Sequence, residues 1–147
     1  MVILASEDIG NANPNALLLA NATFQSVNMI GMPEARIILS QCATYLATSV
    51  KSNAAYLAIN AALEHVRKHP ATAVPLHLRN RPTKLMKDLG YLKGYLYAHD
   101  YDWLEGNQEY LPEGVEGTVF YNPKAIGKEK EIREFLVRKW SDKYKFE

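Results

Sequence analysis

A cluster of basic side chains in the middle of the sequence is its clearest candidate for chemistry. Residues 67–93 contain seven lysines and arginines and only one acid, Asp88. The four closest together are Arg79, Arg81, Lys84 and Lys87. Such a cluster can neutralise phosphates and give salt-dependent, sequence-independent binding to nucleic acid, and the tyrosines that follow it could stack on bases. The alternative is that this basic stretch pairs with the acidic stretch at 100–116 within the fold.

Two histidines, His65 and His69, have the i,i+4 spacing that places two imidazoles on one face of a helix. A zinc site needs three or four protein ligands, and no third is evident. We interpret the pair as part of a basic C-terminal turn, which the helix dipole favours, and we predict no metal site. Cys42 is expected to be a buried apolar side chain, and His77 and His99 to make buried hydrogen bonds.

The sequence contains no phosphate-binding loop. Its one Gly-Lys pair, Gly127-Lys128, has Asn122 where the motif requires glycine and Glu129 where it requires a hydroxyl. The usual dinucleotide, serine-hydrolase and zinc-protease motifs are also missing. The six acids within 100–116 come without a neighbouring base and are read as a solvated face. We therefore predict no catalytic residue and no cofactor in this chain, so that the chain by itself is not an enzyme.

The composition describes one globular domain whose charges are unevenly spread. The 147 residues are 48% hydrophobic and 22% charged, with a formal net charge of +1, which excludes a disordered polyelectrolyte. Residues 1–62 carry only five charged side chains. The uncharged run 9–33 contains too many asparagines for a membrane span, and a single cysteine favours a reducing cytoplasm. The start, with two early acids, argues against a signal peptide, and we expect no membrane partner.

The helix-breaking and helix-capping residues along the chain predict a mainly α-helical bundle of four to six helices. Proline, glycine and capping residues place the expected helices at 3–9, 13–30, 33–48, 52–68, 83–89 and from 124 or 127 to 143. Residues 91–121 hold eight of the fifteen aromatic side chains and are interpreted as an irregular strap, with a short strand considered at 117–121. We expect residues 1–70 to form a helical core, and 71–147 to supply the strap and a last helix packed on the same domain.

The helices of the first half are apolar on several sides. Leu17, Leu18 and Leu19 are consecutive, as are residues 37–39, and neighbours on a helix point about 100° apart. Such helices need cover on most sides. Either residues 75–147 supply it or a second subunit does, and the two are compatible. The candidate subunit-interface residues are Leu17, Leu18, Phe24, Ile37, Ile38, Tyr45 and Tyr56.

The sequence resembles the C-terminal region of the replication-associated recombination protein A family, which includes the Werner-helicase-interacting proteins. The resemblance is carried, in order, by Ser6-Glu7-Asp8-Ile9-Gly10, Asn13-Pro14, Ile30-Gly31-Met32-Pro33-Glu34-Ala35-Arg36, Lys51-Ser52-Asn53-Ala54-Ala55, Pro75-Leu76-His77-Leu78-Arg79-Asn80, Pro82-Thr83-Lys84-Leu85-Met86-Lys87, Tyr97-Ala98-His99-Asp100-Tyr101, Tyr110-Leu111-Pro112 and Phe120-Tyr121. Relatives often have glycine and lysine where this chain has Leu92 and Leu96, and tend to be glycine-rich at 103–107. The last helix matches only in character.

The resemblance implies that the chain is the tail of a larger AAA+ ATPase similar to clamp loaders. The nucleotide-binding module, with its ATP and Mg²⁺, would lie N-terminal to this region, so no catalytic residue is carried over. The parent is expected to be a DNA-dependent ATPase that acts at stalled replication forks in the cytoplasm, associated with the nucleoid. This region would be the helical collar that holds subunits in a tetramer, and DNA and single-strand-binding protein are the partners implied through the parent.

Overall fold

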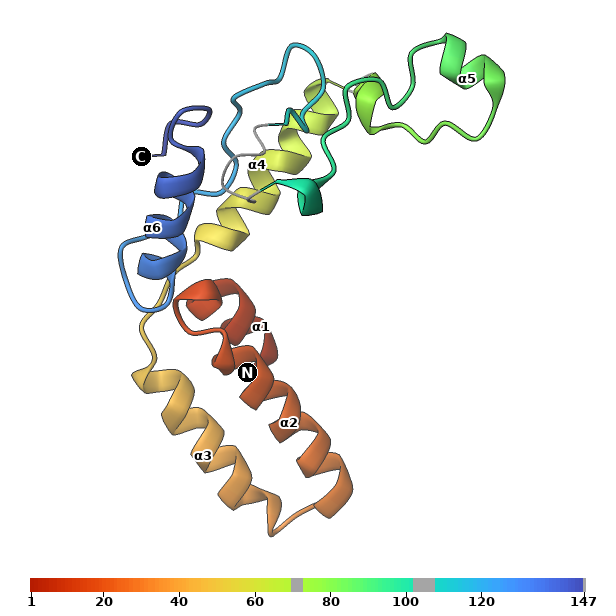
Figure 1. Ribbon diagram of the computed structural model, residues 1–147. Coiled ribbons are helices and arrows are strands. Elements are labelled where there is room, and N and C mark those ends of the chain that lie inside the picture. The colour runs from red at the N-terminus through yellow and green to blue at the C-terminus, as the bar shows by residue number, and fades with distance from the viewer. Residues whose placement is uncertain (70–72, 102–107, 147) are drawn as a thin grey trace.

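Helices and irregular segments make up the whole of the described structure, a computed structural model that describes residues 1–69, 73–101 and 108–146. No strand occurs in these residues. Figure 1 shows three parts: a helical hairpin at one end, a middle region containing α4 (Ala54–Lys68) and α6 (Glu129–Trp140), and an arm that carries α5 (Lys84–Asp88) away from both. The mainly α-helical fold class predicted from the sequence is confirmed.

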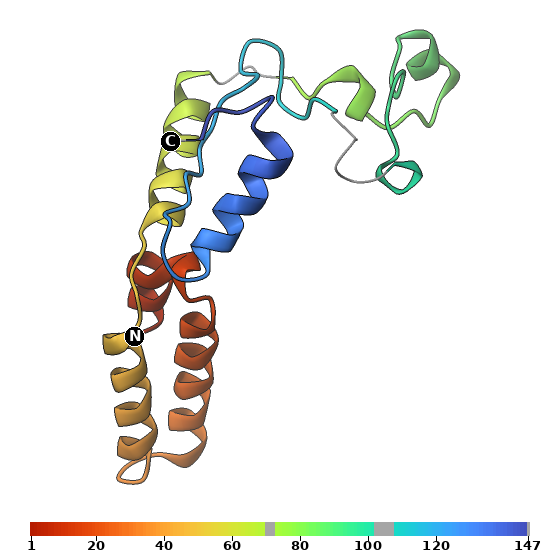
Figure 2. The same ribbon diagram turned by 60° about the vertical axis from the view of Figure 1, so that its left-hand side comes forward.

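The hairpin pairs α2 (Asn15–Ile30) with α3 (Ala35–Thr48). Gly31 ends α2 with a φ of 74°, a conformation that glycine adopts without strain. The main contacts of the two helices are with each other and with the N-terminal turns, and in both views the hairpin extends away from α4 and α6 (Figures 1 and 2). The later half of the chain therefore does not cover the hairpin in the described structure.

The N-terminal turns connect the hairpin to the middle region. They comprise α1 (Val2–Leu4), the π-helical η1 (Ala5–Ile9) and the 3-10 turn η2 (Gly10–Ala12). The backbones approach very closely here. A Cβ on Gly10 would lie 2.7 Å from the carbonyl oxygen of Ser52, and a Cβ on Gly127 would collide with the carbonyl oxygen of Ala12. The Lys128 N–H donates to the same Ala12 oxygen at 2.8 Å. Glycine at these positions lets three segments distant in sequence meet.

The middle region places the segment 118–121 between α4 and α6. On one side the Phe120 ring meets His65 of α4 edge to face, with centroids 5.4 Å apart. On the other side the segment and α6 line an apolar cavity of about 230 Å³ together with Trp140 and Tyr144. The strand considered at 117–121 is not formed, because the neighbours of this segment are helices and loops that offer no strand to pair with.

The arm is built from short turns, η3 (Leu76–Leu78), α5 and η4 (Ala98–Asp100). Thr83 caps α5 as expected, its Oγ1 accepting from the Met86 N–H at 3.3 Å. Figure 2 shows the arm reaching away from the helices of the middle region. Other helices begin a few residues later than the sequence predicts. The helix α2 begins at Asn15 and α6 at Glu129, because Pro14 and Lys128 take the capping positions.

Candidate functional site

The helix α2 directs its small side chains inward and most of its large apolar side chains outward, although Leu19 packs against the core. Ala16, Ala20 and Thr23 are buried at helical spacing toward α3 and the N-terminal turns. Leu18 and Phe24 are 68% and 61% exposed. A helix ordinarily turns its larger apolar residues to the core, because burying them contributes most to stability. The reversed arrangement leaves a surface suited to contact with another protein.

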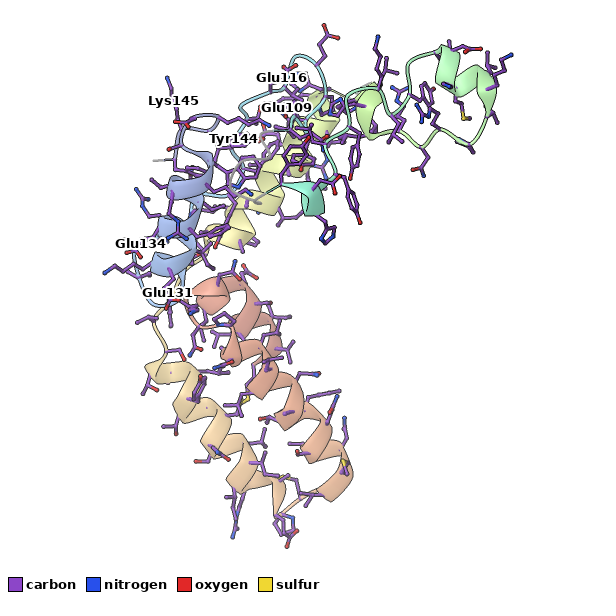
Figure 3. All side chains as sticks on the ribbon, in the orientation of Figure 1. Glu109, Glu116, Glu131, Glu134, Tyr144 and Lys145 are labelled. Atoms are coloured by element: carbon purple, nitrogen blue, oxygen red, sulfur yellow. The ribbon has the colours of Figure 1, made fainter. Side chains whose placement is uncertain are left out.

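The helix α3 repeats this arrangement in part, because its large Leu46 is buried. Its buried side chains are Ala35, Cys42 and Leu46, while Ile37 is 67% exposed. Ile38 is half-buried. Tyr45 is also half-buried and packs on the hairpin core, and its hydroxyl exchanges hydrogen bonds with the Asn13 amide at 3.0 and 3.2 Å. Figure 3 shows side chains projecting outward from both helices of the hairpin.

The candidate interface residues named from the sequence leave out the tip of the hairpin and most of α4. At the tip, Met29, Ile30 and Met32 are 85%, 55% and 68% exposed. On α4, Tyr56 is exposed as a candidate interface residue would be, but so are Leu57, Ile59, Leu63 and Val66. The apolar period of α4 is visible in the sequence. Which side of the helix faces the core is not, because alanines and large apolar residues alternate around it.

The structure separates Arg79 from the other three basic candidates. Arg79 donates from Nε to the Val74 carbonyl oxygen at 2.7 Å and from its guanidinium to the Tyr91 hydroxyl at 3.2 Å, and it lies over the Tyr91 ring. Its guanidinium therefore holds the arm together. Arg81, Lys84 and Lys87 are exposed on the arm, and no ion pair is formed by them within the described residues.

The acidic stretch is held by a lysine that follows α6. Lys143 Nζ lies 3.0 Å from Glu109 Oε2 and donates to the Gln108 carbonyl oxygen at 2.9 Å. Burial raises the pKa of the Glu109 carboxyl, but hydrogen bonds from Leu111 N–H and Lys143, together with the Lys143 charge, outweigh it and leave this pKa below its ordinary value. Figure 3 shows Glu109 and Tyr144 in the same part of the molecule, and Lys143 also lies over the Tyr144 ring. In the described residues the basic arm is not the partner of these acids.

The histidines make packing and hydrogen-bond contacts. His65 and His69 stack at 4.4 Å between centroids, and no cluster of three or more potential metal ligands occurs in the described residues. His77 Nε2 lies 2.7 Å from the Glu109 carbonyl oxygen, which ties the base of the arm to the acidic stretch. The expectation for His99 is wrong: it is exposed and contacts the Tyr97 ring, and its own ring makes no hydrogen bond within the described residues.

A buried polar network fastens α6 to the N-terminal turns. Glu129 is fully buried and accepts from the Tyr121 hydroxyl at 2.8 Å and from the Lys124 N–H at 3.2 Å. The Asn11 amide donates to the Tyr121 oxygen at 3.0 Å. Burial and the neighbouring carboxylate raise the pKa of Tyr121 to about 12, against the opposing effect of Asn11. The network joins α6 to the N-terminal turns through side chains that are distant in sequence.

Across the described parts of the chain, the helices are all too short or too polar to traverse a bilayer.

Comparison with known proteins places these surfaces in context. A family model described as MgsA AAA+ ATPase C terminal matches residues 1–140. Replication-associated recombination protein A of Coxiella burnetii is 44% identical over 148 residues, covering 99% of this chain and 34% of that protein. The Escherichia coli K12 protein of the same name is 42% identical over 91% of this chain and 30% of its own length. ATPase WRNIP1 of Dictyostelium discoideum is 46% identical over 84% of this chain and 14% of its own length.

These relatives are much longer than the aligned region, since the chain spans about a third or less of their length. The match nevertheless runs through the hairpin, the arm and the middle region alike. The chain belongs to the family of C-terminal regions of MgsA-type AAA+ ATPases.

Proposed function

We propose that this chain is the self-association module of a AAA+ ATPase that acts in DNA replication and recombination. The observation that carries the proposal is the reversed burial of the hairpin, with alanines inside and Leu18, Phe24 and Ile37 outside. Large apolar side chains exposed on both helices of a hairpin fit the buried core of a subunit interface. The names of the relatives support the biological setting.

In this proposal the hairpins of several copies pack together, with four as the expected number. The remainder of the parent protein would supply ATP hydrolysis with Mg²⁺, and the assembled module would fix the spacing of the ATPase units at a replication fork in the cytoplasm. The charge-poor composition of residues 1–62 supports this role, because charged side chains are depleted at the centres of interfaces.

The test is sedimentation velocity on this chain at tens of micromolar. The wild type should sediment as an oligomer, and the double variant Leu18→Asn/Phe24→Asn should sediment mainly as monomer. Gln25→Asn changes an exposed polar position of the same helix and is the matched control. A monomeric wild type, or an oligomer that the double variant leaves intact, would refute the proposal.

A second candidate function is contact with nucleic acid through the arm. It is favoured by the position of Arg81, Lys84 and Lys87, which are exposed on a projecting element with no carboxylate bound to them in the described residues. Three exposed cations on such an arm can replace counterions along a phosphate backbone. Arg79 is left out of this site because its guanidinium is engaged within the arm.

This candidate is tested by fluorescence anisotropy with forked DNA at several salt concentrations. The Arg81→Ala/Lys84→Ala/Lys87→Ala variant should bind more weakly, and the slope of log K against log salt should fall by about 0.7–0.9 for each phosphate that the variant no longer neutralises. The control Lys51→Ala/Lys130→Ala/Lys145→Ala removes the same charge from exposed positions elsewhere. Equal reductions of affinity in both variants would show that only net charge matters and would exclude a specific arm site.

A further inference from the structure

The helix α4 carries an apolar row that its own chain leaves uncovered. Tyr56, Ile59, Leu63 and Val66 are 43%, 54%, 48% and 59% exposed. The side of α4 turned to its own chain is lined instead by smaller residues and by His65, whose ring meets Phe120. The exposed row is thus distinct from the face that holds the segment 118–121.

The spacing of the row is that of a helix that packs against another helix. Successive members are three, four and three residues apart, which is the a–d–a–d seam of paired helices. At about 100° per residue the four side chains fall within an arc of about 80°. A seam this narrow fits one helix lying along α4 better than a broad sheet or a flat surface.

The row is also symmetric about its centre, so that a second copy of α4 can pack against it. Each pair of positions, 56 with 66 and 59 with 63, is centred on residue 61. When two copies of α4 are placed antiparallel about a two-fold axis at that position, Tyr56 of one copy faces Val66 of the other, and Ile59 faces Leu63. A two-fold interface requires such self-complementarity, because each contact occurs twice.

The charges of α4 favour the antiparallel arrangement over the parallel one. Its last turn carries Arg67 and Lys68 and its first turn carries no acid. Parallel pairing would place both basic turns together and align the two helix dipoles, whereas antiparallel pairing separates the basic turns by about the 22 Å length of the helix. In the antiparallel register Arg67 lies beside Ala55 of the other copy, so no like charges meet at the seam.

We propose that α4 pairs antiparallel with α4 of a second copy through Tyr56, Ile59, Leu63 and Val66. The pairing rests on the proposed self-association and specifies a second contact in it, separate from the hairpin. Four side chains make a small seam beside the ~800 Å² per partner of a standard interface, so this contact adds to the hairpin contact and does not replace it.

The pairing is tested first by sedimentation of matched variants of this chain. Ile59→Asn/Leu63→Asn should shift the wild-type assembly to a smaller species with at least a tenfold weaker association. Leu57→Asn replaces an equally exposed apolar residue, 52% exposed, that lies off the row, and it should leave the assembly unchanged. Helical content by circular dichroism confirms that both variants fold. If the two variants behave alike, the row is not an interface.

Cysteine crosslinking tests the direction of the pairing in chains that are otherwise wild type. A Tyr56→Cys chain mixed with a Val66→Cys chain of different mass should form a disulfide-linked heterodimer under mild oxidation, and Tyr56→Cys alone should not crosslink. The native Cys42 is fully buried and gives the background. Crosslinking of Tyr56→Cys alone would show parallel pairing and overturn the proposal, as would no crosslink in a chain that still assembles. A monomeric wild type would instead refute the proposed function.

Discussion

The hairpin and the middle region are held together by different chemistry. In the hairpin, small apolar side chains allow α2 and α3 to lie close, and the core residues there include Ala16, Ala20 and Cys42. The middle region depends on directed polar contacts, such as Tyr121 with Glu129 and Lys143 with Gln108. The difference follows the charge distribution of the sequence, because only the second half supplies ionisable side chains in number.

This difference affects what each part leaves on the surface. A core made largely of small side chains, with Leu46 as the large exception on the hairpin, leaves other large apolar side chains outside, where another subunit can bury them. In the middle region, polar contacts instead pair charged side chains with one another, as at Glu109 and Lys143. The arm differs from both regions, since its exposed side chains Arg81, Lys84 and Lys87 are charged and have no carboxylate partner among the described residues. Four stability predictions test the contrast.

The largest effect is expected at the junction of the two regions. Gly127→Ala would drive a Cβ into the Ala12 carbonyl oxygen and the Val50 side chain, at a residue whose φ is 50°. We expect a reduction of about 2–4 kcal/mol in the free energy of unfolding, measured by urea denaturation. Gly114→Ala is the control, because its φ is also positive, at 86°, but no atom lies within 4 Å of the added Cβ. Equal reductions would show that backbone conformation, and not the junction, sets the cost.

The hairpin core should reject larger side chains. Ala20→Leu adds three carbons at a position that is 1% exposed, and the overpacking should cost about 1–3 kcal/mol of unfolding free energy. Ala22→Leu, at an exposed position of the same helix, should change stability by less than about 0.5 kcal/mol. Thermal or urea unfolding of both variants measures the difference. If Ala20→Leu left the free energy of unfolding unchanged, the hairpin core would be packed less tightly than in the structure.

The middle region should respond to removal of a single hydroxyl. Tyr121→Phe removes the group between Asn11 and Glu129 and leaves a fully buried carboxylate with one partner fewer, at a cost of about 1–2 kcal/mol. Tyr95→Phe removes a hydroxyl from a side chain that is 42% exposed and should be nearly neutral. Chemical denaturation compares the two, and a neutral Tyr121→Phe would contradict the role given to the network.

The smallest effect concerns the Glu109 carboxyl. Its pKa in the folded chain lies below the ordinary value of 4.5, so the stabilisation it provides is present above pH 4.5 and is lost as the pH falls through the folded-state pKa. The side chain is partly exposed, and we expect less than about 1 kcal/mol. Glu109→Gln should lose this component of the pH dependence of unfolding, whereas Glu113→Gln, at an exposed acid nearby, should retain it. Identical pH profiles for wild type and Glu109→Gln would exclude the effect.

Local signals predicted most of the elements. Gly10 and Gly31 end helices as expected, and Thr83 begins one, because these signals act within a few residues. The strand considered at 117–121 failed for the opposite reason: strand formation needs a partner segment, and partner choice is not encoded locally. Part of the expected strap, 102–107, lies outside the described residues.

The candidate sites depended on longer-range information. The basic cluster was visible in composition. That Arg79 is bound within the arm was not visible, because Val74 and Tyr91 reach its guanidinium only in the folded structure. The apolar excess of the first helices was likewise evident. That alanines would take the inside, leaving Leu18 and Ile37 exposed, was not predictable because either face of these helices is apolar enough for a core.

The sequence by itself therefore determined the helical class, several helix ends, the missing phosphate-binding loop and the family, since these rest on residue type and short spacing. The tertiary structure alone decided which faces are free. Which of two apolar faces a helix buries depends on how closely its neighbours approach, and glycine contacts and alanine packing set that distance in three dimensions.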